Sequence, residues 1–321
     1  MKTSVNALGI QTFLRHLIDY AGLFPPASLS LENAIENYRT YKFGEDEWML
    51  GPFVVPASRL KELDAYAGLF SREKPLAISA IGEKSGDAAG CLEALQETLA
   101  QIEAFRRQHG ERVSIGTLEL PLPPVPADQT LLEKVSAEAR KLGLMVFCEV
   151  TTVHVSSPEW EKAMIAALDA IAAHHAKGGD ALGFKLRTGG VTADMFPSPQ
   201  QLAAVIAGCR DRQIPMKFTA GLHHPIRSYR EEIGGRMHGF LNVFIAGMIA
   251  HVHGLGPDEI ARILADEDPG HFRFTDEGLG WLDYRITNEQ IAALRSRMLR
   301  SYGCCSFDEP REDLRALKFL A

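Results

Sequence analysis

Two lysines occupy matching positions in neighbouring apolar segments of the sequence, residues 182–187 and 216–220. In an extended segment, alternate side chains point to opposite faces, so Lys185 and Lys217 lie on the face opposite to the apolar side chains. A lysine inside a closed sheet is costly to bury while charged, and a cationic neighbour lowers its pKa further. A neutral lysine amine is the nucleophile that Schiff-base chemistry needs, so the two lysines are the first catalytic candidates.

Acidic residues follow the same alternation on two earlier segments. Residues 113–120 place Glu119 on the inner face, and residues 144–150 do the same for Glu149. These carboxylates could pair with the lysines or move protons, and we include both among the catalytic candidates. The alternative is a buried lysine–glutamate network that only stabilises the interior, because structural ion pairs also perturb pKa values.

The loops that follow the two lysine segments predict a region that binds a small, anionic substrate. Glycines in such loops let backbone N–H groups approach a phosphate or carboxylate, and arginines can supply charge. The simpler interpretation of each glycine is a turn. Asp19, near the end of the first candidate strand, is either a third acid of the site or a turn residue. The expected substrate-binding residues are Asp19, Arg187, Gly189, Gly190, Gly221, His223, His224 and Arg227.

The adjacent pair His223 and His224 raises the alternative of a metal-dependent enzyme. Side chains of adjacent residues diverge on an extended segment, so one metal ion would bind one of these histidines and take its other ligands from carboxylates. The loop histidines more simply contact substrate or backbone. We therefore assign no metal ligand and expect no cofactor.

Short apolar runs alternate with longer amphipathic stretches along the whole sequence, which is typical of parallel strands joined by helices. Eight strand candidates are residues 17–23, 53–56, 76–81, 113–120, 144–150, 182–187, 216–220 and 272–274. Helical periodicity is found at residues 31–43, 58–70, 87–109, 129–142, 158–176, 198–212, 238–251 and 288–301.

Eight strands and eight helices in about 300 residues predict an α/β protein with the fold of a (β/α)₈ TIM barrel. We expect a single domain over residues 1–300 and a short C-terminal tail, residues 301–321, packed on the barrel. An open doubly wound sheet is the runner-up. No strand candidate is followed by the glycine-rich nucleotide loops that such sheets often carry.

The amino-acid composition argues against nucleic acid and membranes as binding partners of this protein. The chain has 321 residues, 34 Lys and Arg against 41 Asp and Glu, and a net charge of −7, which gives no electrostatic support for nucleic-acid binding. No apolar run approaches the length of a membrane span or signal peptide, so we expect a cytoplasmic protein without a membrane partner. The five cysteines have no metal-binding spacing and are expected to be reduced thiols. Homo-oligomer formation is compatible with these features.

Residues 181–227 resemble the class I aldolases of the deoxyribose-phosphate aldolase type. In that family a strand similar to G-F-[IV]-K-T-S-T-G carries the Schiff-base lysine, and the next strand carries a second lysine. Gly183-Phe184-Lys185 aligns with the first motif and Lys217 with the second. The chain has Glu119 where the family has an aspartate. Separately, residues 217–225 and 305–310 resemble an uncharacterised bacterial and plant family of TIM barrels, which implies no function.

Three hypotheses follow. The first is a Schiff-base lyase similar to aldolases, in which Lys185 attacks a small carbonyl compound, Lys217 lowers the pKa of Lys185, and Glu119 or Glu149 moves protons. The second is a metal-dependent barrel enzyme that uses His223 or His224 with carboxylates. The third is a non-catalytic barrel that binds a small anionic ligand through Arg187 and the glycine loops.

Overall fold

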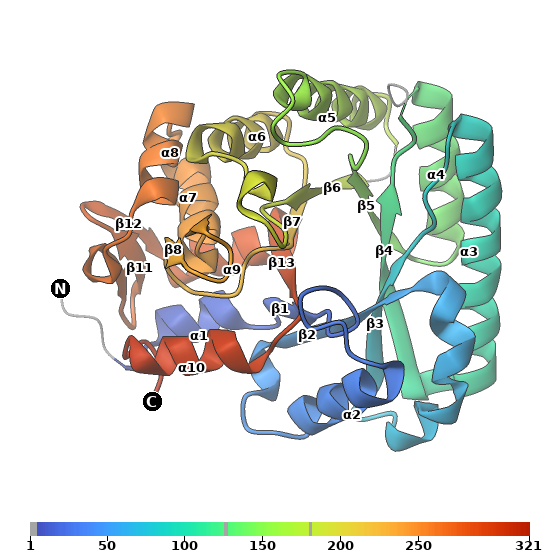
Figure 1. Ribbon diagram of the computed structural model, residues 1–321. Helices are drawn as coiled ribbons and strands as arrows, with labels where there is room; N and C mark the ends of the chain where they lie inside the picture. Colours follow the sequence, from blue (N-terminus) through green and yellow to red (C-terminus); the bar gives the residue numbers. More distant parts are fainter. Residues whose placement is uncertain (1–4, 125–127, 180–181) are drawn as a thin grey trace.

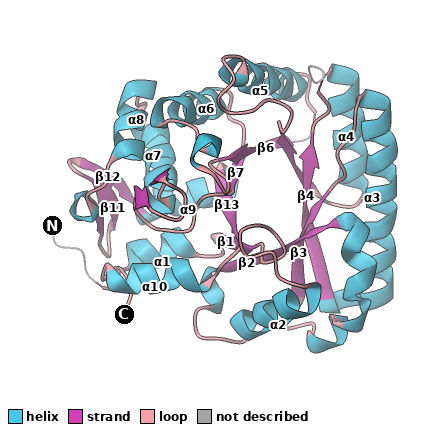
Figure 2. Ribbon diagram, in the orientation of Figure 1, coloured by secondary structure: helices cyan, strands magenta, loops and turns pink. Residues whose placement is uncertain are grey.

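The computed structural model describes residues 5–124, 128–179 and 182–321 and forms a (β/α)₈ TIM barrel, as the alternation of strands and helices predicted (Figure 1). Eight parallel strands close in the order β1-β13-β7-β6-β5-β4-β3-β2. Helices surround this ring of strands (Figure 2). The barrel strands are β1 Ile18–Tyr20, β2 Leu50–Pro56, β3 Leu76–Ile81, β4 Val113–Pro121, β5 Met145–Glu149, β6 Leu182–Arg187, β7 Met216–Thr219 and β13 Leu299–Cys304.

The eighth barrel strand is β13, and the expectation that Phe272–Phe274 would close the barrel is wrong. Phe272–Phe274 is strand β10 of a separate antiparallel sheet with β11 Gly278–Trp281 and β12 Tyr284–Thr287. Strand β13 pairs in parallel with both β1 and β7, which closes the ring. It also runs across residue 300, where the barrel was expected to end and the tail to begin.

Two of the helices between barrel strands begin at serines that cap their first turn. Ser30 accepts a hydrogen bond from the Asn33 backbone N–H, and Ser198 forms a capping box with Gln201. The connecting helices are α2 Leu31–Lys42, α3 Ala88–His109, α4 Gln129–Lys141, α5 Trp160–Ala176, α6 Pro199–Asp211, α7 Phe240–His253 and α9 Asn288–Arg297. The helix expected at residues 58–70 is instead a pair of 3₁₀ helices, Ala57–Ala65 and Ala67–Leu69.

Three further helices were not predicted. They are α1 Leu8–Leu14, α8 Pro257–Ala265 and α10 Asp308–Ala316. Helix α10 follows β13 (Figure 1). The backbone N–H of Asn6 donates to the carbonyl of Phe319, so the two described ends of the chain are joined directly. A short hairpin of β8 Ser228–Arg230 and β9 Gly235–Met237 lies between β7 and α7.

The register of the barrel strands sets the level of the ionisable side chains. Glu149 pairs with Lys185 between β5 and β6, and Lys185 pairs with Lys217 between β6 and β7. One step below Lys185 on the same face, Gly183 leaves room for the ring of Phe147, which would lie 2.5 Å from a Cβ at position 183. The phenylalanine fills the barrel interior beneath the ionisable layer.

Within the described part of the chain, no helix combines the length and the apolar character that crossing a membrane requires.

Candidate active site

A cavity of about 530 Å³ opens where the barrel strands end at their carboxyl side. This is the end at which TIM-barrel enzymes carry their active sites, and the volume suits a small molecule. The ends of β2 to β7, strand β13 and the loops after β1, β6, β7 and β13 contribute to its walls. The candidate residues that line it are Glu119, Glu149, Lys185, Arg187, Gly190, Gly221 and His223.

Lys185 lies between the two glutamates that the sequence placed on the inner face. Its Nζ is 2.6 Å from Glu119 Oε2 and 2.7 Å from Glu149 Oε2. The lysine is only 4% exposed, yet it lines the cavity. A buried amine at a cavity wall is accessible to a ligand there while its charge is neutralised by carboxylates behind it.

Lys217 lies deeper in the barrel and is 1% exposed. Its Nζ is 2.7 Å from Asp19 Oδ2 and donates to Glu119 Oε1. Ser79 completes the environment, because its hydroxyl donates to the same Glu119 oxygen at 2.7 Å. Glu119 therefore joins the two lysines, one at each carboxylate oxygen.

The carboxylates hold both lysines in the charged form. Burial opposes the charge, but Glu119 and Glu149 raise the pKa of Lys185 above its ordinary value. Asp19 and Glu119 outweigh burial in the same way and raise the pKa of Lys217. Conversely, the two ammonium groups overcome the effect of burial on Glu119 and lower its pKa to about 2. Lys185 was expected to have a lowered pKa beside Lys217; its pKa is instead raised, since each lysine has its own acidic partners.

Asp19 is a partner of Lys217 in this structure. Its Oδ2 accepts a hydrogen bond from the Ser301 hydroxyl at 2.7 Å, and Oδ1 has no hydrogen-bond partner among the described residues. Burial raises the pKa of Asp19, although Lys217 acts against this effect. Gly51 provides the space, because a Cβ at that position would be 2.1 Å from Asp19 Oδ1.

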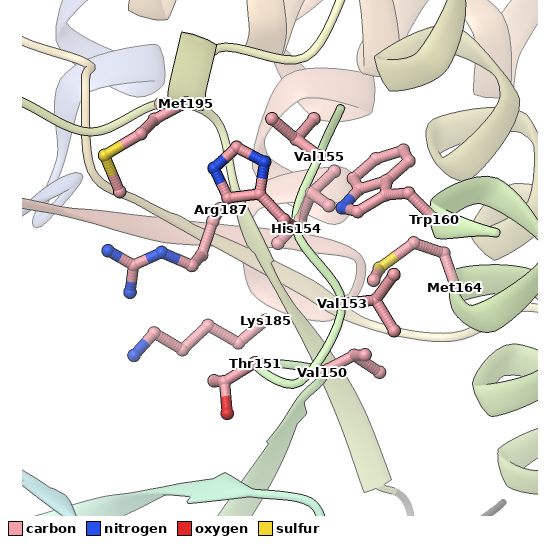
Figure 3. Close-up of a pocket in the computed structure, with 12 residues that line it drawn as sticks. Val150, Thr151, Val153, His154, Val155, Trp160, Met164, Lys185, Arg187 and Met195 are labelled. Carbon is pink, nitrogen blue, oxygen red and sulfur yellow. The ribbon is translucent and has the colours of Figure 1, made fainter. Parts of the chain in front are cut away.

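Arg187 extends the line of alternating charges toward solvent. Its Nη1 lies 3.2 Å from Glu149 Oε1, and its side chain is 46% exposed. Lys185 and Arg187 extend in the same direction from β6, next to a smaller pocket of about 130 Å³ (Figure 3). The sequence of ion-paired groups is thus Asp19, Lys217, Glu119, Lys185, Glu149 and Arg187; we call it the ionic chain.

Close packing explains why glycines occupy the loops after β6 and β7. A Cβ on Gly189 would meet the ring of Phe196 at 2.4 Å, and one on Gly190 would meet the Met195 sulfur at 2.5 Å. Gly221 has a φ of +75°, which favours glycine, and a Cβ there would lie 3.0 Å from the Gly189 Cα. These glycines allow the loops after β6 and β7 to approach each other closely. Binding of an anion by their N–H groups stays a prediction.

The two histidines bind different acids on helix α10. His223 Nδ1 is 2.9 Å from Glu309 Oε2, and His224 Nδ1 is 2.6 Å from Asp313 Oδ2. Only His223 is in the described lining of the cavity. In the described ranges, no three or more His, Cys, Asp or Glu side chains are grouped so that they could hold a metal ion. The geometry of the histidines therefore gives no support to the metal-dependent alternative.

Arg227 lies away from the ionic chain, whereas two serines that were not candidates contact it. Arg227 Nη1 lies 3.0 Å from His238 Nδ1, its Nε is 3.9 Å from Glu267, and it is outside the described cavity lining. Ser79 and Ser301 contact the ionic chain but were not candidates. Both are on inner faces of barrel strands, so strand alternation could have indicated Ser79, whereas Ser301 required the correct eighth strand.

Comparisons with known proteins complement this geometry. No family model and no curated protein sequence matches the chain. Among solved structures, the chain is similar to one described as a "putative deoxyribose-phosphate aldolase" from Toxoplasma gondii ME49, with 11% identity, 96% of both chains covered and a TM-score of 0.48. It is also similar to type I 3-dehydroquinate dehydratase from Clostridium difficile, with 10% identity, 64% of this chain and 76% of that chain covered, and a TM-score of 0.36.

A third similar structure is the IOLI protein with a bound zinc atom, with 12% identity, 77% of this chain and 95% of that chain covered, and a TM-score of 0.42. Identities this low are compatible with unrelated activities on one fold, so function has to be inferred from the side chains of the site.

Proposed function

We propose that this chain is a class I lyase similar to aldolases, which forms a Schiff base between Lys185 and a small carbonyl compound. The observation that carries the proposal is the position of Lys185: a buried amine at the wall of the cavity, with a carboxylate oxygen within 2.7 Å on each of two sides. Lys217 has an equally charged environment, but it is outside the described cavity lining. Lys185 is therefore the nucleophile.

The first step requires that Lys185 transfer a proton before it attacks. Glu119 and Glu149 both accept hydrogen bonds from its Nζ, so either can receive the proton directly. Glu149 is the better acceptor, because two lysines and Ser79 already stabilise the ionised form of Glu119. The neutral amine then adds to the carbonyl carbon, the carbonyl oxygen takes up the proton, and loss of water leaves an iminium ion.

The raised pKa of Lys185 has two opposite effects on this reaction. It lowers the fraction of neutral amine available for attack at neutral pH. However, the iminium nitrogen carries its positive charge where the ammonium charge was, so the same two carboxylates stabilise the intermediate. The ionic chain thus favours the charged Schiff base over a neutral adduct.

Carbon–carbon cleavage follows from the charge on the iminium nitrogen. The electron pair of the breaking bond moves toward this nitrogen and gives an enamine, while a carboxylate removes the hydroxyl proton of the departing aldehyde. Protonation of the enamine carbon and hydrolysis of the imine return Lys185 and release the second product. Arg187, half exposed at the edge of the cavity, would bind an anionic group of the substrate.

Borohydride reduction tests the Schiff base. The protein is incubated with a panel of small aldehydes and ketones, reduced, digested and analysed by mass spectrometry. We expect one reduced adduct at Lys185 with at least one member of the panel and none at that position in Lys185→Met. Lys177→Met changes an exposed lysine of the same chain and should leave the adduct intact. Absence of an adduct at Lys185 with every compound, or labelling confined to exposed lysines, would contradict the proposal.

A non-catalytic barrel that binds a small anion is the second candidate. The ion pairs favour this candidate, because each lysine in the ionic chain already has two carboxylate partners. Thermal stabilisation by small carboxylates, without any turnover or trapped adduct, would support this candidate over the lyase.

A further inference from the structure

A thiol, an imidazole and a carboxylate lie in series at the mouth of the same cavity. Cys305 follows β13, His223 follows β7, and both line the cavity. Cys305 Sγ is 4.0 Å from His223 Nε2, within the range of a hydrogen bond to sulfur. The other ring nitrogen, Nδ1, is 2.9 Å from Glu309 Oε2 on α10. Nothing in the lyase mechanism above uses these three side chains.

The order of the three groups is that of a nucleophile, a general base and an acid that orients the base. Glu309 accepts the Nδ1 proton of His223, which leaves Nε2 facing the Cys305 sulfur. Burial opposes a charge on His223, but its contacts with Cys304, Cys305 and Glu309 raise the pKa of the imidazole above its ordinary value. This geometry lets the imidazole take the thiol proton as the Cys305 sulfur attacks a substrate.

The neighbouring cysteine provides an internal comparison. Cys304 Sγ lies 3.9 Å from His223 Nδ1, the nitrogen already held by Glu309. Cys304 is also outside the described cavity lining, where a ligand would meet Cys305. Cys148 and Cys209 are fully buried, and burial raises the pKa of both thiols. Position therefore distinguishes Cys305 from the other thiols.

We propose that Cys305, His223 and Glu309 form a second reactive site, which takes the acyl group of a small ester or thioester. The Cys305 sulfur forms a bond to the acyl carbon, the bond from that carbon to the leaving oxygen or sulfur breaks, and the leaving group takes its proton from His223 Nε2. Water then attacks the acyl-cysteine while His223 accepts the water proton. The bond between sulfur and the acyl carbon breaks, and the Cys305 sulfur takes the proton back from His223. The products are a carboxylic acid and the alcohol or thiol of the leaving group, so no oxidant or reductant is needed.

Acylation by p-nitrophenyl acetate tests the site on the full-length protein. We expect a burst of p-nitrophenolate close to one equivalent per chain and an acetyl group on Cys305 in the digested wild-type protein. Cys305→Ser should lose the burst, whereas Cys304→Ser, the matched control, should retain it. His223→Gln should slow acylation by about 100-fold or more, because it removes the general base.

Glu309 acts through His223, so it is a positioning residue and needs a different readout. Glu309→Gln should slow acylation by about tenfold or more, and Glu309→Asp, which keeps the carboxylate, should restore part of the rate. Thermal melting of each variant separates these effects from loss of folding. Acetylation of wild-type protein only at other residues, or unchanged acylation of Cys305 in folded His223→Gln, would overturn the proposal. Both results are independent of borohydride trapping at Lys185.

Discussion

Replacement of Glu119 by glutamine removes the one carboxylate that both buried lysines share. The lysines lower the pKa of Glu119 from its ordinary 4.5 to about 2. At 1.36 kcal/mol for each pH unit, this change corresponds to about 3 kcal/mol of folding stability at neutral pH. Loss of one partner of a buried ion pair typically costs about 3–5 kcal/mol, which agrees with this value. We therefore expect Glu119→Gln to lower the free energy of unfolding by about 3 kcal/mol at pH 7.

The pH dependence has a definite sign. Because the folded pKa of Glu119 is below the unfolded value, its contribution is fully present above pH 4.5 and is lost as the pH falls toward about 2. Glu119→Gln has no such titration. The difference in stability between wild type and variant should be largest at neutral pH and should shrink progressively below pH 4.5.

Urea unfolding at a series of pH values measures this difference directly. Glu103→Gln is a suitable control, because Glu103 forms an exposed pair with Arg107 and should change stability by less than about 1 kcal/mol. The reasoning would be refuted by a difference for Glu119→Gln that stays constant down to pH 2, or by one no larger than that of the control.

Three further perturbations test other parts of the site. Lys217→Met leaves Asp19 without its cation and Glu119 with only Lys185, and it should lower the melting temperature; adding Asp19→Asn should recover part of the loss, and purely additive losses would argue against the pairing. Gly51→Ala puts a Cβ 2.1 Å from Asp19 Oδ1 and should cost about 1–3 kcal/mol in urea unfolding; a neutral result would contradict the close contact. Arg187→Met should change urea stability by less than about 0.5 kcal/mol but abolish thermal stabilisation by phosphate or pyruvate. Retention of that stabilisation would remove Arg187 from the proposed binding site.

Strand alternation was enough to predict which ionisable side chains meet inside the barrel. Lys185, Lys217, Glu119 and Glu149 each interrupt an apolar strand at an inward position, and the barrel brings them into contact. Alternation predicts the face of the strand on which a side chain lies, but it does not predict the residues with which that side chain pairs. It could not show that the acids lie so close to the lysines that the lysine pKa values rise.

The eighth strand was missed for a physical reason. Residues 272–274 have the apolar alternation of a strand, whereas Leu299–Cys304 contains arginine, serine and glycine and follows α9 after a single residue. Gly303 of this strand lines the cavity, and the small residues of the strand give it no apolar alternation by which it could be recognised. Glu309 and Asp313, far from His223 and His224 in sequence, have no local pattern that indicates their pairing.

The ionic chain also restricts the register in which the barrel strands can pair. Its members come from β1, β4, β5, β6 and β7, and the contact between Lys217 and Glu119 joins strands that are not neighbours in the ring. If β4 were displaced by one residue, Glu119 would turn toward the helices and leave two ammonium groups buried without their shared partner. The apolar residues alone would tolerate several alignments, since many positions accept leucine, isoleucine or valine. The ionisable layer therefore disfavours barrels in which the strands pair in the wrong register. This effect does not depend on the reaction that the site carries out.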